Sequence, residues 1–467
     1  MGSISRQDIR EIALKDRLLD ALKRARADYA EVRYEVTDGN AIGYRGEEID
    51  TMSSSRYMGG IARACTKGGW GIATFDDVQD IPHAVEEACA CAALVGKEKT
   101  ELAETEPVHE TVPARLDRDF RGVPLDEKLA LVGKYNDIVL KADPAVKTSS
   151  VFFADAFRRV YFASSRGSYF MEERPRVVLS ASAVARDGSL VQRAHHSVSS
   201  ARTYDVVVGL EEKIEAAARR AADLLRARPC EGGVHTVILD QKLAGVFAHE
   251  AFGHLSEGDF LYENPKMRDL MHCGREMGVE GLNIVDDGSA PDLLGSLAFD
   301  DEGTRTGKTH LIKEGVLVNH LHSLETAAKM GEPPTGNARA IDRRRPPIVR
   351  MTNTYIEPGE GTFEDLIADV DSGIYACDMV GGQTMMEMFT FSAGHGFRIE
   401  NGEVGEMIRD ITLTGNVFET LHNIDGFAND FEVHQTGGGC GKGGQSPLPV
   451  TFGSPHIRIR DVVVGGR

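Results

Sequence analysis

Two histidines, His249 and His254, lie five residues apart in the segment His-Glu-Ala-Phe-Gly-His, and this spacing restricts the local backbone. A regular α-helix turns about 100° per residue, so residues five apart point about 140° away from each other. The two imidazoles can approach one another only if the helix ends or widens to a π-type turn, where i and i+5 nearly eclipse. Gly253 would permit either change. The spacing therefore predicts an interrupted helix.

The residue types in this segment are those of a metal-assisted hydrolase. Imidazoles are common ligands of Zn²⁺, and Glu250 follows the first histidine directly. If the two imidazoles converge, the Glu250 carboxylate would lie beside them and could take a proton from a metal-bound water. We favour this interpretation over a chance pattern.

A catalytic zinc site needs a third protein ligand, and the residues alone leave it open. The downstream candidates are Glu257, Asp259, His272, His434 and Cys440. The two acids are more typical of solvated turns, and the His320–His322 pair is more typical of strand histidines with ordinary hydrogen bonds. Cys440 lies among glycines, which let backbone approach an ion closely, and a thiolate is a good soft ligand. A flexible surface loop with an incidental thiol explains that pattern equally well.

Pro229 and the glycine pair that follows it predict a boundary between two domains, residues 1–230 and 231–467. The length supports this division, because single cores stop growing beyond roughly 250–300 residues. We predict an α+β fold. Its N-terminal α/β domain would have an antiparallel sheet and helices, with an acidic linker near residues 98–114. Its C-terminal domain would be mostly β and would carry the metal-site helix.

Periodicity predicts the individual elements. Apolar residues at helical spacing predict helices over residues 7–25, 78–94, 125–142, 210–227 and 242–254. Alternating apolar and polar residues predict several antiparallel strands over 151–200. Asp38-Gly39 and Lys67-Gly68 are predicted to form turns, and short Val/Ile/Thr-rich runs after Gly303 predict mostly strands.

Charge and cysteine content limit the partners and the compartment. The chain has 72 Asp and Glu against 53 Lys and Arg, a formal charge of −19, which argues against binding to nucleic acids or anionic membranes. It contains no apolar run of about 18 residues that could span a bilayer. Seven scattered cysteines and a polar stretch at Met1–Arg10 fit a reducing cytoplasm. We expect a cytoplasmic protein without nucleic-acid or membrane partners.

Four longer motifs make essentially the whole chain resemble a TldD-type subunit of the TldD/PmbA metalloprotease family. They are HEAFGHLSEGDF (249–260), PPIVRMTNTYIEPG (346–359), SAGHGFRIENGEVG (392–405) and GGGCGKGGQ (437–445). The resemblance implies a peptidase with Zn²⁺ as cofactor. It implies His249, His254 and Cys440 as metal ligands and Glu250 as general base. PmbA-type partners lack the metal motif, so this chain resembles the catalytic subunit.

The same resemblance implies a dimer, either a homodimer or a heterodimer with a PmbA-type subunit. Small or unfolded peptides would enter a cavity as extended strands and pair with sheet edges. The net negative charge favours cationic or neutral peptides. The alternative is a non-catalytic, chaperone-like subunit that binds peptides and holds a structural metal, since cysteine-containing sites are often structural. Access of water to the metal would distinguish the two functions.

Overall fold

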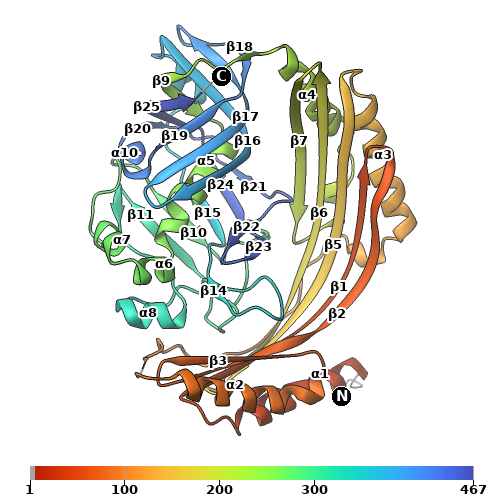
Figure 1. Cartoon of the computed structure of the whole chain (residues 1–467), viewed down its shortest axis with the longest axis vertical. Helices are drawn as coiled ribbons and strands as arrows, with labels where there is room; N and C mark the ends of the chain where they lie inside the picture. The colour runs from red at the N-terminus through yellow and green to blue at the C-terminus, as the bar shows by residue number, and fades with distance from the viewer. Residues whose placement is uncertain (1–5, 99, 466–467) are drawn as a thin grey trace.

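The computed structural model describes residues 6–98 and 100–465, so the first five residues of the polar N-terminal stretch lie outside it. The described chain has an α+β fold with two bodies beside each other (Figure 1). The first half of the chain builds a long curved sheet with helices, and the second half builds a β-rich body. The predicted fold class is confirmed, whereas the domain boundary between residues 230 and 231 stays a prediction.

Long antiparallel strands form the N-terminal sheet, whose central order is β3-β2-β1-β5-β6, with β4 and β7 also paired to β6. The strands are β1 (Tyr29–Arg45), β2 (Glu48–Thr66), β3 (Gly69–Phe75), β4 (His109–Val112), β5 (Val146–Ser164), β6 (Tyr169–Asp187) and β7 (Leu190–Ser200). The strands predicted over 151–200 and the turn at Lys67-Gly68 are confirmed.

Two pairs of helices cover the two ends of this sheet (Figure 1). They are α1 (Arg6–Leu22) with α2 (Ile81–Val95), and α3 (Leu125–Lys141) with α4 (Glu211–Arg226). Each pair closes its own hydrophobic cluster against the strands. The predicted helices are therefore present, with ends that differ by a few residues. Short 3₁₀ turns over Val78–Asp80, Phe120–Gly122 and Tyr204–Val207 complete this half.

The structure corrects one predicted turn and adds a strand. Asp38-Gly39 lies inside β1, and the chain turns later, near Gly46. Gly39 is needed for close packing, because a Cβ there would lie 2.7 Å from the carbonyl oxygen of Asp155 on β5. In the predicted acidic linker near residues 98–114, the chain is irregular over residues 100–108 and enters the sheet at His109 as β4, parallel to β6.

The C-terminal body contains an eight-stranded and a six-stranded sheet. In the larger sheet, pairing of β16 with β17 closes a ring in the order β16-β9-β25-β19-β17. The larger sheet comprises β8 (Arg228–Pro229), β9 (Gly233–Leu239), β16 (Ser372–Met385), β17 (Met388–Glu400), β18 (Glu403–Arg409), β19 (Thr412–Asn416), β20 (Ile424–Phe427) and β25 (Ile457–Gly465). The smaller comprises β10 (Ile284–Asp287), β11 (Lys308–Lys313), β12 (Val316–Leu317), β15 (Asn353–Ile356), β21 (Glu432–His434) and β24 (Thr451–Ser454).

Short elements connect these sheets. Two small hairpins pair β13 (Ala338–Arg339) with β14 (Ile348–Val349), and β22 (Cys440–Lys442) with β23 (Gln445–Leu448). The helices are α5 (Gln241–Phe247), α6 (Gly258–Glu263), α7 (Pro265–Leu270), α8 (Leu324–Met330), α9 (Phe363–Ile367) and α10 (Val417–His422). The mostly β character predicted after Gly303 is confirmed. No helix in residues 6–98 and 100–465 is long and apolar enough to cross a bilayer.

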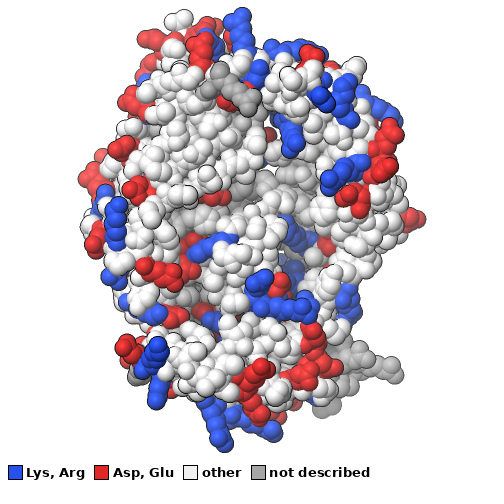
Figure 2. All heavy atoms as spheres, viewed as in Figure 1, with Lys and Arg blue, Asp and Glu red and all other residues white. Residues whose placement is uncertain are grey.

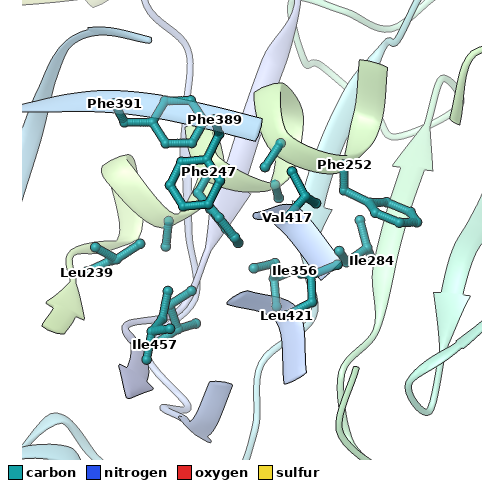
Figure 3. Packing of buried hydrophobic residues seen from close by; sticks show 14 of the residues in the cluster. Leu239, Phe247, Phe252, Ile284, Ile356, Phe389, Phe391, Val417, Leu421 and Ile457 are labelled. Carbon is teal, nitrogen blue, oxygen red and sulfur yellow. The ribbon is translucent and has the colours of Figure 1, made fainter. Parts of the chain in front are cut away.

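Helix α5 is buried between the two C-terminal sheets. The ring of Phe247 meets those of Phe389 and Phe391 on β17 edge-on, with centroids 5.5 and 6.0 Å apart (Figure 3). On the other sheet, a Cβ at Gly245 would lie 3.0 Å from the backbone nitrogen of Gly453 on β24. Core packing on both sides therefore fixes the helix that leads into His249.

A cleft of about 720 Å³ separates the long sheet from the C-terminal body. Arg158 and Arg176 line it from the sheet, and Arg339, Pro447 and Leu448 line it from the other side. Figure 2 shows the molecule hollowed between its two bodies, with Lys and Arg side chains along the hollow. The cleft is open to solvent and large enough to take an extended peptide segment.

Candidate metal centre

The backbone at the two histidines has the predicted interruption. Helix α5 ends at Phe247, a π-helical turn spans Ala248–Gly253, and a 3₁₀ turn follows over His254–Ser256. The π-turn brings the rings of His249 and His254 to 5.4 Å between centroids. Gly253 was expected to permit this change of backbone geometry, but its φ of −56° is ordinary for any residue. Glycine is needed there because a Cβ would lie 2.0 Å from the sulfur of Met351.

The structure places Cys440 beside these two histidines. One donor atom from each of His249, His254 and Cys440 lies within 4.8 Å of the other two. The Cys440 Sγ is 3.3 Å from His254 Nε2, although the two residues are 186 positions apart in sequence. Cys440 reaches the cluster at the start of β22, in the glycine-rich hairpin. The residues could not distinguish this site from an incidental surface thiol, whereas in the structure the thiol is buried.

The chemistry of the three side chains fits a soft or borderline metal ion. Neither ring nitrogen of the buried His249 makes a well-aligned hydrogen bond within the described residues. Burial alone would raise the pKa of the Cys440 thiol, but the adjacent imidazoles of His249 and His254 lower that pKa to about 4. Two imidazoles and a thiolate are a donor set that Zn²⁺ accepts well. A cation would satisfy the one lone pair that the neutral His249 ring carries.

Glu257 orients His254. The buried Glu257 Oε2 accepts a hydrogen bond from His254 Nδ1 at 3.0 Å and lies 3.0 Å from the Lys442 ammonium. Burial opposes ionisation, but His254 and Lys442 together lower the pKa of the Glu257 carboxyl. Because Nδ1 donates to Glu257, Nε2 is the ring nitrogen that faces Cys440 and is available to a metal ion. Glu257 therefore positions a candidate ligand and does not itself join the group of three donors.

The other candidate ligands have different partners. Asp259 pairs with Lys442 at 2.5 Å, and exposed His272 contacts the carbonyl of Asp269 at 2.9 Å. The ring of His434 on β21 packs near Phe452, 6.1 Å between centroids. Within the described part of the chain, the donor group therefore consists of His249, His254 and Cys440, and none of these other candidates belongs to it.

Two residues that sequence reasoning missed hold the Cys440 hairpin. The buried guanidinium of Arg350 donates to the carbonyl oxygen of Cys440 at 2.6 Å and to that of Gln445 at 3.1 Å. Lys442, one residue beyond Gly441, ties the same hairpin to Glu257 and Asp259. The sequence did contain signals that could have pointed to both residues. Lys442 is the only charged residue in the glycine-rich run 437–445, and Arg350 lies in the Pro346–Gly359 motif.

One side of the cluster is open to solvent. The side chain of Glu250 is 27% exposed and that of His254 is 20% exposed, whereas His249 and Cys440 are buried. The Glu250 Oε2 lies 3.8 Å from His254 Nε2. A carboxylate therefore borders the donor atoms on the side where water can approach, which is the arrangement that general-base chemistry requires.

Glu257→Gln is expected to weaken Zn²⁺ binding by about 10- to 100-fold, the usual effect of removing a carboxylate that orients a metal-bound histidine. Glutamine keeps the size of the side chain but removes the charge that holds His254 and Lys442. Competition with a chromophoric chelator at neutral pH measures the affinity, and Glu280→Gln, at an exposed position, is the matched control. Equal affinities in Glu257→Gln and the control would contradict the positioning role.

The fold and the site define an α+β protein with a candidate His/His/Cys metal centre. Three models of one family match in succession: PmbA/TldA metallopeptidase domain 1 over residues 30–92, its central domain over 118–228 and its C-terminal domain over 232–466. The chain belongs to the PmbA/TldD metallopeptidase family.

Individual relatives agree with this assignment. A protein from Synechocystis, named a metalloprotease, is 42% identical over 95% of this chain and 96% of its own length. A protein from Saccharolobus solfataricus, named a zinc metalloprotease TldD homolog, is 29% identical over 94% and 97%. The crystal structure of TldE from Thermococcus kodakarensis has the same fold, with a TM-score of 0.77, 20% identity, and coverage of 97% of this chain and 100% of that one.

Proposed function

We propose that this protein is a zinc-dependent peptidase that cleaves small or unfolded peptides. His249, His254 and Cys440 would hold the metal, and Glu250 would act as general base. The observation that carries this proposal is the donor cluster that is buried on one side and open on the side of Glu250. When bound, Zn²⁺ would supply a Lewis acid that polarises the scissile carbonyl and lowers the pKa of water.

The residues of the chain then have separate tasks. The Glu250 carboxylate accepts a proton from the attacking water and returns it to the leaving amine, so that no covalent acyl-enzyme forms. Glu257 keeps the His254 ring in one tautomer and orientation. Arg350 fixes the backbone that carries Cys440. Glu257 and Arg350 already make these hydrogen bonds in the structure, so the site is largely preorganised.

The cleft is the proposed path of the peptide to this centre. Its lining does not include the three donor residues, but one hairpin reaches both places, because Leu448 lines the cleft and pairs with Cys440. On the side of the long sheet, Ala201 lines the cleft just beyond β7, an edge strand that pairs only with β6 among the described strands. Near its end, Ser199 donates to the carbonyl oxygen of Gln435 at 2.9 Å. An extended peptide could add to that edge by main-chain hydrogen bonds, which would give little dependence on sequence.

The competing function is a chaperone-like peptide-binding subunit with a structural metal. The exposure of Glu250 and His254 favours catalysis, because structural zinc sites are closed by four protein ligands and catalytic sites keep one open position. A cytoplasmic location and a dimer, formed with a second copy or with a PmbA-type subunit, belong to the same proposal. The preference for cationic or neutral peptides is also part of it.

The test is cleavage of an unstructured fluorogenic peptide by the purified full chain, alone and with a PmbA-type partner. We expect turnover that a chelator abolishes and that added Zn²⁺ restores, with mass spectrometry showing hydrolysed peptide bonds. Lys-rich and Glu-rich versions of the peptide at low salt test the charge preference. A zinc-loaded protein that binds the peptide without cleaving it, with and without the partner, would contradict the peptidase and favour the binding subunit.

A further inference from the structure

A second group of metal-ligand side chains lies apart from the first. One donor atom from each of Cys273, His320 and Glu332 lies within 4.8 Å of the other two. The Cys273 Sγ is 3.8 Å from His320 Nδ1, and the Glu332 Oε2 is 2.9 Å from the same nitrogen. These residues come from the turn after α7 and from the segments before and after α8, where Gly331 ends the helix in a left-handed conformation. The proposed peptidase centre uses none of them.

The hydrogen bonds of His320 point to a positive charge in this group. Its Nε2 lies 2.7 Å from the carbonyl oxygen of Met271, and a carbonyl can only accept, so Nε2 carries a hydrogen. Its Nδ1 then faces both oxygens of Glu332 and the sulfur of Cys273. A neutral imidazole would direct a lone pair at a carboxylate. The arrangement therefore requires either a second proton on the ring or a cation between the three side chains.

His322 supports the carboxylate of this group. Its Nε2 lies 3.1 Å from Glu332 Oε2, and its Nδ1 lies 3.1 Å from the hydroxyl of Thr326. Both histidines of the His-Leu-His segment are buried, and Glu332 lies between their rings. The ordinary hydrogen bonds predicted for this pair are therefore present, but His320 and His322 lie outside any strand. Sequence spacing could not reveal the thiol that joins them, because Cys273 is 47 residues from His320.

We propose that Cys273, His320 and Glu332 form a second site, for a divalent transition-metal ion of the zinc class. His322 would orient Glu332. A thiolate, an imidazole and a carboxylate are a donor set suited to Zn²⁺ or Co²⁺ and poorly suited to Ca²⁺ or Mg²⁺. Cys273 is exposed, so an ion can reach the site from solvent, while His320 anchors it in the interior.

The second site lies next to the backbone that supports the first. Leu321 donates to the carbonyl of Ser256 at 2.8 Å, and Gly258 donates to the carbonyl of Leu321 at 2.8 Å. These contacts flank Glu257, the carboxylate that orients His254. A cation held by His320 would fix this segment and, through it, the position of Glu257. We assign the second ion a supporting role and no part in peptide hydrolysis.

Metal counting on the full chain tests this inference, after removal of metal with a chelator and dialysis against excess Zn²⁺. We expect two ions per chain in the wild type, one in Cys273→Ser, one in Cys440→Ser and none in the double variant. Cys91→Ser, at a partly buried position in α2, is the matched control and should keep both ions. One ion in the wild type that Cys273→Ser retains would overturn the second site and leave the first intact.

Alkylation of Cys273 provides a test that needs no substitution. The exposed thiol should react with iodoacetamide in the metal-free protein and be protected at least about tenfold when Zn²⁺ is bound, since a coordinated thiolate reacts slowly. Mass spectrometry of the modified peptide shows whether Cys273 is alkylated, so the result does not depend on metal binding at the first centre. Equal alkylation rates with and without Zn²⁺ would show that His320 and Glu332 form only an ion pair.

Discussion

Cys440→Ser should cost the protein one bound zinc ion and lower the affinity of the His249–His254 centre by more than about 100-fold. Loss of a residue that merely orients a ligand costs about 10- to 100-fold, and loss of a ligand should cost more. Cys440 is held as a thiolate by the two imidazoles, with a pKa lowered to about 4, whereas a serine hydroxyl stays protonated. Elemental analysis and a chelator titration measure the loss, and His254→Ala should behave in the same way.

The control for this experiment is Cys91→Ser, which removes a thiol that belongs to neither donor group. Circular dichroism and thermal unfolding without metal verify that each variant is folded. Wild-type zinc content in Cys440→Ser together with a loss in His254→Ala would move the third ligand elsewhere. Glu257, which contacts His254 through the opposite ring nitrogen, and His434 would then be the next residues to replace.

Glu250→Gln should reduce peptide hydrolysis by about 10²- to 10⁴-fold while the bound zinc remains, the range that a lost general base usually produces. Glutamine has nearly the same shape as glutamate but cannot accept the proton from the attacking water. The effect should appear in kcat rather than KM, because Glu250 acts on the reacting atoms. Turnover of an unstructured peptide, measured at saturating and limiting concentrations, separates the two constants.

Glu263→Gln, an exposed carboxylate on α6, is the matched control and should cleave at the wild-type rate. Glu250→Gln with full activity and full zinc would remove Glu250 from the mechanism. A rate loss accompanied by loss of metal would instead assign Glu250 to metal binding, since its Oε2 lies 3.8 Å from His254 Nε2.

Local geometry was the most predictable part of the site. The five-residue spacing of His249 and His254 requires a departure from α-helical geometry, and the structure has the π-turn. The helices and the strands of 151–200 followed from periodicity, because each buries one face against the core. The prediction of a turn at Asp38-Gly39 was wrong. The same dipeptide also occurs in a strand where glycine allows a neighbouring backbone to come close, and here that neighbour is the backbone of Asp155.

Contacts between distant segments were not predictable from the residues alone. The approach of Cys440 to His254 depends on α5, on the hairpin and on the buried Arg350 that holds it. The resemblance implied Cys440 as the third ligand, and spacing had left that ligand open. The reason for Gly253 is likewise tertiary, since the sulfur of Met351 occupies the place of a Cβ. Pairing of Cys273 with His320 depends on how the turn after α7 packs against the segment before α8.

In the proposed function, the β22–β23 hairpin would couple two equilibria, the binding of the metal and the binding of the peptide. One of its strands presents Cys440 to the histidines, and the other forms part of the cleft wall at Pro447 and Leu448. A peptide that tightens this hairpin must raise the affinity for the metal, and by thermodynamic linkage the metal raises the affinity for that peptide by the same factor. Metal-free protein would then release its substrate more readily, so zinc availability would govern retention of the peptide as well as its cleavage.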